Sequence, residues 1–478
     1  MERSVPRRQS LIVEILIVAV ILASTLSHII SSGHIPDTVG KGGPGAVIYW
    51  NDVRQTIAGF GISSAWTVDD LMKFPEPSRT EILELLFSQS SGAGFSIVRN
   101  EIGSGGGIPA TSSTQTIEPA EGVWNWTGDE GQIWVMNQAR RYGVTTFVSS
   151  VWSPPAWMKT NGSVTNGGYL RTDKYQAFAE YLAQYILGYK SQHGLDVYAV
   201  SPANEPNIDA IYQSCLWTGR DFDTFIKDYL KPTFTKDNVP ARIILPESSM
   251  WSDNLASNIL RDKDASTRLD IVAAHDYSAA QVNPLWAVKS QKKEQWQTEV
   301  SSISLNDPGM TDGLYWAKRI YQHMTDAETN AWLWWLAVHP LGPNVDGEGL
   351  INIDVTDGTF AVAKRLYTIG NYSRFIRPGY VRIASASYKV SNVYVSAYKA
   401  SSTGTFVVVA VNQGNTEQPL NVMLNHFSAS AVTPYETSNT KNLQQLPALP
   451  VSNGEFSVTL PAQSVTTFVG EGTSAPID

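Results

Sequence analysis

Two glutamates in the 478-residue chain each follow a short apolar run, at the position where a buried strand would end. Glu205 lies in the segment SPANEPN (residues 201–207), where Pro206 would stop a strand, and Glu299 lies in QTEVS (residues 297–301). A carboxylic acid can protonate a leaving oxygen, and a second carboxylate can attack the carbon that this oxygen leaves. About 5–5.5 Å apart, two such groups can break a glycosidic bond with retention of configuration. Either glutamate alone could be an ordinary solvated charge, so the hypothesis depends on what positions the pair.

Short apolar runs alternate with helical patterns over residues 56–371, as in an α/β protein. A doubly wound sheet is disfavoured, because no glycine-rich phosphate turn follows the first strand, and 103–107 lacks the dinucleotide spacing. Strand after strand followed by a helix or long loop instead predicts a (β/α)8 TIM barrel. The predicted strands are 56–63, 95–99, 145–152, 197–203, 242–246, 270–275, 295–300 and 331–338. The predicted helices are 78–90, 130–142, 173–192, 252–261 and 311–324, with Asp173 and Thr311 as N-caps of two of them.

The helical patterns end after Asn371, and β-rich runs broken by Gly, Asn, Ser and Pro follow. This spacing is typical of a sandwich, so we predict an all-β sandwich side domain over residues 372–478. Its predicted strands are 381–383, 393–398, 405–411, 420–424 and 465–469.

The barrel prediction places the two glutamates on one face. Side chains that do chemistry in this fold gather at the carboxyl ends of the strands. Glu205 would end the fourth strand and Glu299 the seventh, so the two would face each other across the barrel mouth. Asn204 could then hydrogen-bond a sugar 2-hydroxyl as charge develops in the transition state.

Composition narrows the function classes. Charged residues make up 17% of the chain and the net charge is −9, so there is no basic surplus for nucleic acid. All 15 tryptophans lie between Trp50 and Trp335, and indole rings either fill a core or stack on sugars. The lone Cys215 is best read as structural, and the scattered histidines predict no metal site. A serine-hydrolase elbow is present only in the degenerate form GISSA (61–65), so we expect no such mechanism and no cofactor.

The N-terminus has the pattern of a targeting segment. Arg3, Arg7 and Arg8 precede an apolar run over 15–23, and small residues follow it. We predict a signal peptide or signal anchor at 1–30 and a Gly/Pro/Ser-rich linker at 31–45. The protein is therefore expected to be secreted, with membrane attachment through residues 11–30 if the segment is retained.

Several longer segments resemble glycoside hydrolase family 30, and the last of them is most similar to the family's xylanase branch. Asn204-Glu205-Pro206 with a second glutamate on the seventh strand is shared with related retaining hydrolases. The other segments are GFGISSAW (59–66), WSPPAWMKTN (152–161), His275-Asp276-Tyr277, Trp334-Trp335, RFIRPGYV (374–381) and LPAQSVTTF (460–468).

The resemblance implies a barrel at 56–371 with the sandwich at 372–478, joined by an N-terminal strand at 46–55. It implies Glu205 as general acid/base and Glu299 as nucleophile. His275 could hold the nucleophile region by a hydrogen bond, and the alternative is a structural histidine. The substrate-binding residues it implies, together with Asn204 and His275, are Trp66, Trp152, Trp157, Tyr277 and Trp335.

The chain departs from this branch at one place. Glucuronoxylan-specific members carry an arginine after the tryptophan pair, where Val338 and His339 stand here. We therefore expect a monomeric hydrolase of β-1,4-xylan that does not depend strictly on glucuronosyl branches. The alternatives are hydrolysis of β-1,6-glucan or β-1,6-galactan, or a catalytically silent carbohydrate-binding protein.

Overall fold

The structure, a computed structural model, describes residues 43–106, 115–278, 281–303, 307–341 and 347–474. The predicted targeting segment at 1–30 and most of the predicted linker lie outside these residues. Within the described ranges, no helix combines the length and the apolar character that a membrane crossing requires.

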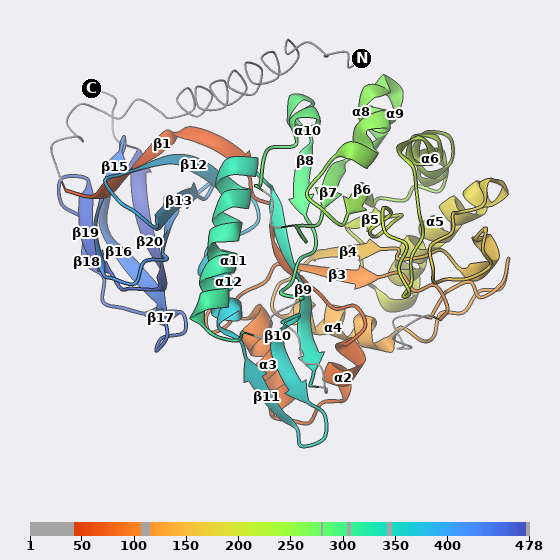
Figure 1. Cartoon of the computed structure of the whole chain (residues 1–478), viewed down its shortest axis with the longest axis horizontal. Coiled ribbons are helices and arrows are strands. Elements are labelled where there is room, and N and C mark those ends of the chain that lie inside the picture. The colour runs from red at the N-terminus through yellow and green to blue at the C-terminus, as the bar shows by residue number, and fades with distance from the viewer. Residues whose placement is uncertain (1–42, 107–114, 279–280, 304–306, 342–346, 475–478) are drawn as a thin grey trace, which may run out of the picture.

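Parallel strands form a closed barrel, which confirms the predicted fold class (Figure 1). Each strand pairs in parallel with its neighbours, and β9 pairs with both β8 and β2, so the sheet closes. The strands are β2 (Gly59–Ser63), β3 (Ile97–Glu101), β4 (Thr146–Ser150), β5 (Ala199–Ser201), β6 (Arg242–Ser248), β7 (Ile271–Ala274), β8 (Glu294–Gln297) and β9 (Ala331–Pro340). An antiparallel pair, β10 (Gly349–Asp354) and β11 (Thr359–Val362), extends the sheet beyond β9.

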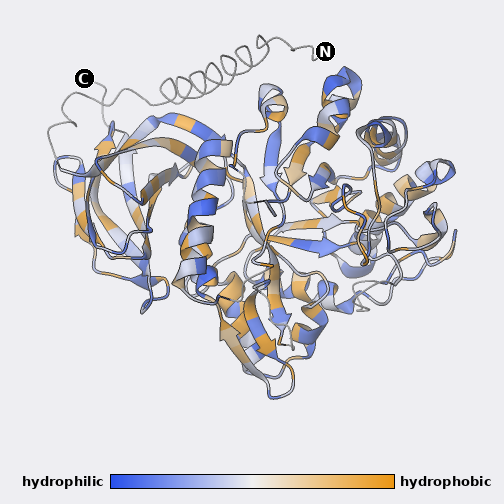
Figure 2. Ribbon diagram, viewed as in Figure 1, coloured by the Kyte–Doolittle hydropathy of each residue, from blue (hydrophilic) through white to orange (hydrophobic). Residues whose placement is uncertain are grey.

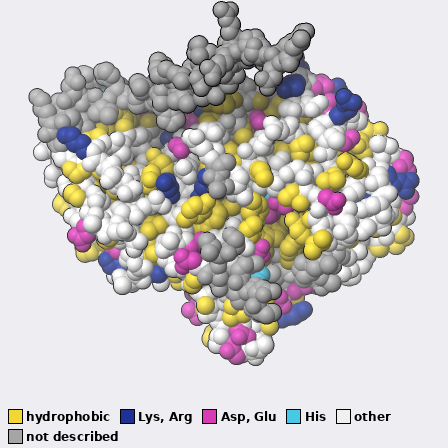
Figure 3. All heavy atoms as spheres, viewed as in Figure 1, with side chains coloured by type: hydrophobic (Ala, Val, Ile, Leu, Met, Phe, Trp, Pro, Cys, Tyr) yellow, Lys and Arg dark blue, Asp and Glu magenta, His cyan; other side chains and the backbone are white. Residues whose placement is uncertain are grey.

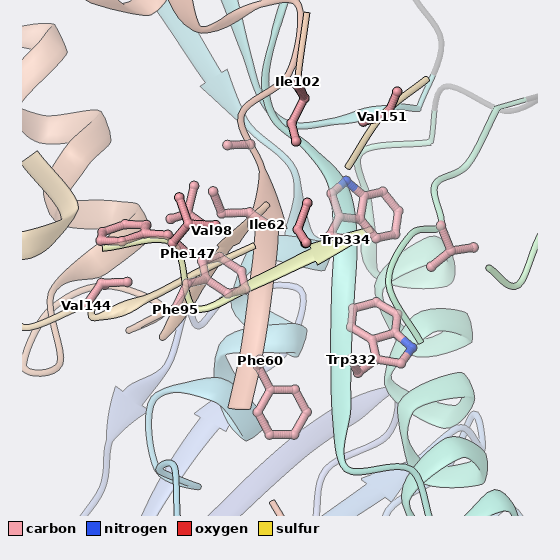
Figure 4. Close-up of a cluster of buried hydrophobic side chains, with 14 of the residues drawn as sticks. Phe60, Ile62, Phe95, Val98, Ile102, Val144, Phe147, Val151, Trp332 and Trp334 are labelled. Carbon is pink, nitrogen blue, oxygen red and sulfur yellow. The ribbon is translucent and has the colours of Figure 1, made fainter. Parts of the chain in front are cut away.

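The barrel strands bury both faces, because side chains alternate between the interior and the helix layer. In β3, Ile97 packs in the interior cluster, whereas Val98 packs in the larger core under the helices (Figure 4). Trp332 and Trp334 of β9 also face the helices, since they contact Trp316. Alternation then returns Arg99 to the interior, at the end of the barrel where the strands finish.

Helices follow most strands, broadly as predicted. They are α2 (Val68–Lys73), α3 (Ser78–Phe87), α4 (Glu130–Arg141), α5 (Tyr175–His193), α6 (Gly219–Phe225), α7 (Lys231–Lys236), α8 (Ser257–Arg261), α9 (Lys263–Arg268), α10 (Trp286–Ser290), α11 (Met310–Gln322) and α12 (Lys364–Ser373). The predicted N-caps are wrong: Lys174 caps α5 and Gly309 caps α11. Asp173 instead accepts hydrogen bonds from the Arg171 guanidinium, which competes for its carboxylate.

The C-terminal strands form a β-sandwich-like domain around a second core. Aromatic residues fill that core, Phe406, Phe427, Phe456 and Phe468 among them, and hydrophobic and hydrophilic residues alternate along its strands (Figure 2). The strands are β12 (Val381–Tyr388), β13 (Val393–Lys399), β14 (Thr405–Asn412), β15 (Gln418–Asn425), β16 (Phe427–Thr437), β17 (Gln444–Gln445), β18 (Leu449–Pro450), β19 (Glu455–Leu460) and β20 (Ser464–Ser474).

The N-terminal strand β1 (Gly45–Thr56) lies in the sheet of this side domain, not in the barrel. It pairs antiparallel with β12 and parallel with β15. Trp50 of β1 packs against Phe406 and Phe427 in the second core, so one tryptophan belongs to the side domain and not to the barrel. Helices α11 and α12 stand between barrel and side domain, where buried Asn371 donates to Tyr435 O and Thr467 Oγ1 (Figure 1).

Charged side chains are sparse and scattered over the visible surface, and no basic patch gathers on that face (Figure 3). Eight of the 15 tryptophans are buried, and Trp296, Trp332 and Trp334 are among the largest fully buried side chains. Cys215 is also buried, and burial raises the pKa of its thiol to about 11, so it is unsuited to act as a nucleophile at neutral pH.

Candidate active site

Glu205 and Glu299 lie together at the mouth of the barrel. Glu205 follows β5 and Glu299 follows β8, and the two are 7% and 5% exposed. One oxygen of each carboxylate and one ring nitrogen of His275 lie within 4.8 Å of one another. This separation allows the two carboxyl groups to act on one bond.

The two carboxylates have different hydrogen-bond partners. Glu299 accepts from Arg99 Nη1 at 2.6 Å and from the Tyr277 hydroxyl at 3.0 Å. Glu205 accepts from the Tyr212 hydroxyl at 3.1 Å and lies 3.1 Å from His275 Nδ1. The fixed positive charge therefore contacts Glu299, whereas Glu205 contacts groups that are neutral or can lose a proton.

His275 does not hold Glu299 in the way the sequence analysis expected. Its Nδ1 is 3.7 Å from Glu299, beyond hydrogen-bond distance, so its bond is to Glu205. The reason is the position of β7, which neighbours both β6 and β8 and delivers His275 between the two carboxylates.

Arg99 of β3 is a fully buried cation that connects several groups under the mouth. Besides Glu299, it donates through Nη2 to Asn204 Oδ1 at 2.6 Å and through Nε to Glu247 Oε1 at 3.1 Å. Its guanidinium lies 4.7 Å from the ring centroid of Trp152. Since the guanidinium is planar and rigid, these contacts fix the orientation of each partner.

The buried charges shift the protonation equilibria of Glu299 and His275. Burial raises the pKa of Glu299, an effect that His275 and Arg99 oppose and Glu205 reinforces. Burial lowers the pKa of His275, but the two glutamates outweigh it and raise that pKa above its ordinary value. Arg99 contacts Glu299 and not Glu205, so its positive charge stabilises the carboxylate form of Glu299.

Four aromatic residues cluster beside the pair. Trp66 lies 6.2 Å from Trp152, 5.3 Å from Trp335 and 5.7 Å from Tyr212, measured between ring centroids. Trp335 follows the alternation of β9, in which Ala331 and Leu333 face the interior, and it therefore packs in this cluster and not against the helices. Trp152 and Trp335 are only 2% and 3% exposed, so Trp66 and Tyr212 offer most of the accessible ring surface.

Trp157 does not join this cluster. Its indole N–H donates to Glu118 O, and Lys174 Nζ lies 5.4 Å from its ring centroid. The short helix that carries it, Ala156–Met158, directs it to the outer loop.

A metal ion is disfavoured by the charges present. Glu205, His275 and Glu299 are spaced as metal ligands could be. The Arg99 guanidinium, however, already binds Glu299 at 2.6 Å and would repel a cation there. The arrangement is therefore suited to proton transfer and nucleophilic attack by carboxylates.

Arg99, Tyr212 and Glu247 were absent from the site expected from the sequence. Arg99 ended the second predicted strand and Glu247 directly followed the fifth, so both stood where barrel chemistry collects. Charged residues at strand ends were therefore the signal that could have found them. Tyr212 lies in a long loop, and nothing in its neighbourhood distinguishes it.

Asp276, which follows His275 in the chain, forms an ion pair with a residue of helix α11. It receives a bidentate ion pair from Arg319 at 2.5 and 2.6 Å and lies 3.0 Å from His323 Nε2. Asp276→Asn would leave a nearly buried guanidinium without its counter-charge, so we expect a loss of about 3–5 kcal/mol of unfolding free energy. Urea unfolding measures this loss. The control is Asp262→Asn, which removes a more exposed ion pair with Lys227 and should cost clearly less unfolding free energy. Equal losses in the two variants would contradict the assignment.

The same ion pair predicts a pH dependence. Burial raises the pKa of Asp276, but His323 and Arg319 lower it by more than burial raises it. The pKa of Asp276 in the folded protein therefore lies below the ordinary value of an aspartate. Its contribution to stability is therefore complete above about pH 4, the range of an unfolded aspartate. It is lost as the pH falls through the lowered pKa, and the difference between wild type and Asp276→Asn should shrink there.

Known proteins agree with this fold. Residues 57–373 match the model of Glycosyl hydrolase family 59, and residues 379–468 match that of the Glycosyl hydrolase family 30 beta sandwich domain. The glucuronoxylanase XynC of Bacillus subtilis (strain 168) is 34% identical over 342 residues, which cover 69% of this chain and 75% of that protein. The endo-1,6-beta-D-glucanase BGN16.3 of Trichoderma harzianum is 24% identical over 90% of this chain and 88% of that protein.

A solved structure covers barrel and side domain together. The catalytic domain of the family 30 xylanase C from Talaromyces cellulolyticus has a TM-score of 0.78 at 29% identity, over 89% of this chain and 99% of that one. The side domain, the xylanase relative and this structure agree on the family expected from the sequence motifs. The chain therefore belongs to glycoside hydrolase family 30, with a barrel that also matches the family 59 model, and it is a glycoside hydrolase.

Proposed function

We propose that the protein cleaves β-1,4-xylosidic bonds in xylan with retention of configuration. The observation that carries the proposal is the close, buried pair of carboxylates, Glu205 and Glu299, with one oxygen of each within 4.8 Å. Two displacements at the anomeric carbon return the starting configuration, and only a closely spaced pair can perform both.

The two glutamates have different tasks in this proposal. Glu205 donates its proton to the glycosidic oxygen while Glu299 attacks the anomeric carbon, forming a glycosyl ester and releasing the leaving sugar. Glu205, now a carboxylate, then takes a proton from water, which attacks the same carbon and releases Glu299. The Arg99 contact to Glu299 supports this division, because it stabilises the carboxylate form.

Neighbouring residues would hold the sugar. Asn204 has its oxygen bound by Arg99, which leaves its N–H₂ to donate to a sugar hydroxyl oxygen. Trp66 and Tyr277 are partly exposed beside the pair, so their rings can contact the apolar face of a pyranose. Tyr212 can hold Glu205 through its hydroxyl while the proton moves.

The xylanase relatives favour xylan as the substrate. The negative charge of Glu348 near the site favours activity that does not depend on glucuronosyl branches. Val338 and His339 stand at the end of β9, in the region where the family resemblance leads us to expect an arginine in glucuronoxylan-specific enzymes. Glu348 lies 3.9 Å from His339 Nε2. Burial and then the two glutamates of the pair raise the pKa of Tyr212 and Tyr277, and the charge of Glu348 adds a smaller effect in the same direction. An acidic side chain so close to the site would repel a glucuronate carboxylate.

Hydrolysis of a β-1,6-glucan is the second candidate. It is supported by the Trichoderma harzianum relative, whose similarity extends over both domains. The same barrel and carboxylates serve either linkage, because loops and aromatic residues decide which sugar is accepted.

Product analysis tests the proposal. Purified enzyme is incubated with glucuronoxylan, arabinoxylan, linear xylan, β-1,6-glucan and β-1,6-galactan, and products are identified by mass spectrometry, with Glu299→Ala as control. We expect xylo-oligosaccharides from linear as well as branched xylan. Cleavage confined to glucuronoxylan, at a fixed distance from the branch, would contradict branch independence. Products from the β-1,6-glucan alone would establish the second candidate.

We also propose that the enzyme acts outside the cell, as the apolar segment at residues 15–23 and the size of a polysaccharide substrate suggest. Activity recovered in the medium from cells expressing the full chain, and lost on deletion of residues 1–30, would support export.

A further inference from the structure

Glu247 is a third buried carboxylate at the barrel mouth, and it contacts both sides of the pair. Its side chain is 0% exposed, and its Oε1 accepts from Arg99 Nε at 3.1 Å. The same guanidinium donates to Glu299, so Glu247 and Glu299 share one cation. On the other side, the main-chain oxygen of Glu247 accepts from the amide of Glu205 at 2.9 Å.

An irregularity in β6 directs Glu247 into the barrel. Pro246 pairs with Ala273 and Ser248 with Ala274, so Glu247 is an extra residue between two paired positions. In the same strand Ile244 faces the interior and Leu245 the helices, and strict alternation would therefore send Glu247 toward the helices. Bulges of this kind redirect side chains next to active sites.

The backbone at Glu247 is also unfavourable. Its φ of 53° lies in the left-handed region, as does the φ of 47° at Glu205 on the neighbouring strand. A residue with a β-carbon pays roughly 1 kcal/mol or more to adopt this conformation. Two such residues, hydrogen-bonded to each other through the backbone, point to a function for Glu247 that outweighs this cost.

We propose that Glu247 is a positioning residue for the hydrolysis, which fixes Arg99 between Glu299 and Asn204 and supplies a negative charge that sets the pH range of the catalytic pair. The inference rests on the proposed retaining mechanism. Glu247 itself contacts no substrate, and it acts through Arg99 and through the backbone of Glu205.

The charges around Glu247 support this role. The charged or titratable groups that face it are Arg99 from β3 and His275 from the end of β7. Burial raises the pKa of Glu247, but Arg99 and His275 lower it by more than burial raises it. The Glu247 carboxyl group is therefore ionised throughout the neutral pH range. An ionised Glu247 takes a share of the Arg99 charge that would otherwise act on Glu299, and it disfavours a second negative charge nearby.

The test is the pH profile of kcat/KM on xylan for wild type, Glu247→Gln and Glu436→Gln. Glutamine keeps an oxygen for Arg99 but removes the charge, so both limbs should shift by about one unit toward lower pH. We also expect kcat to fall on the order of 10²-fold, because a neutral amide holds Arg99 more weakly than a carboxylate does. Glu436 is the matched control: a buried carboxylate paired with Lys441 in the side domain, whose loss should leave both limbs in place. A Glu247→Gln profile at the wild-type position, whatever its height, would overturn the proposal.

Two further measurements keep the proposal decidable. Glu247→Asp retains the charge but shortens the reach to Arg99, so kcat should fall while the limbs stay near the wild-type pH; an undiminished kcat would overturn the positioning role. A ¹³C NMR titration of labelled glutamate carboxyls follows the ionisation of Glu205 and Glu299 without turnover. In Glu247→Gln the titration of these two carboxyls should shift to lower pH. Unchanged titration would contradict the inference. A wild-type enzyme that is inactive on every glycan tested would contradict only the proposed function, and this titration would still decide the role of Glu247.

Discussion

Replacing Glu299 by alanine is expected to lower kcat on xylan on the order of 10⁴-fold or more, since no other group can attack the anomeric carbon. The structure makes this prediction specific. Glu299 is the carboxylate that Arg99 holds at 2.6 Å and Tyr277 at 3.0 Å, with its oxygens aimed at the mouth. Loss of the side chain leaves space for a small anion. Azide added to Glu299→Ala should therefore attack an activated β-xylobiosyl substrate and give the α-azide.

The rate, the azide product and the folding of this variant are separate measurements. Circular dichroism and the melting temperature establish that Glu299→Ala is folded. A β-azide product, or a kcat within tenfold of the wild type, would show that Glu299 is not the nucleophile.

Replacing Glu205 by glutamine is expected to lower kcat on xylan by about 10³-fold, within the range of general acid catalysis. The loss should depend on the leaving group. A dinitrophenyl β-xylobioside releases an anion that needs no proton, so the first step should remain within about tenfold of the wild type. Deglycosylation still requires a base, and an initial burst of dinitrophenolate should therefore precede a slow steady state.

Comparison of the two substrates separates a catalytic from a structural effect. The control is Tyr212→Phe, which removes one hydrogen bond to Glu205 but leaves the carboxyl, and should retain activity toward both substrates at a reduced level. An equal loss on xylan and on the aryl glycoside in Glu205→Gln, with no burst, would contradict the role of Glu205.

The barrel was predictable because short strands, which are buried on both faces, alternate along the chain with helical patterns. All the barrel strands expected from the sequence occur, from β2 to β9. The side domain was predicted in part. The strands β16, β17, β18 and β19 were missed. In β16, residues such as Ser428 and Ser430 interrupt the hydrophobic pattern.

The site was predictable where residue type and strand end coincide, as at Glu205 and Glu299. The contacts that determine the ionisation of these two glutamates could not be predicted, because they join residues from five different strands. Arg99 lies 200 residues from Glu299 in the chain, and their contact follows only from closure of the barrel. Glu247 faces inward through a register irregularity, and period-two reasoning assigns it to the wrong side.

The anomeric configuration of the first product tests the central claim most directly. ¹H NMR spectra recorded during the first minutes of hydrolysis of a linear xylo-oligosaccharide distinguish the two anomers before mutarotation mixes them. The close pair of Glu205 and Glu299 predicts that the β-anomer of the newly formed reducing end appears first and the α-anomer later. Initial appearance of the α-anomer would contradict a double displacement, and with it the roles assigned to both glutamates.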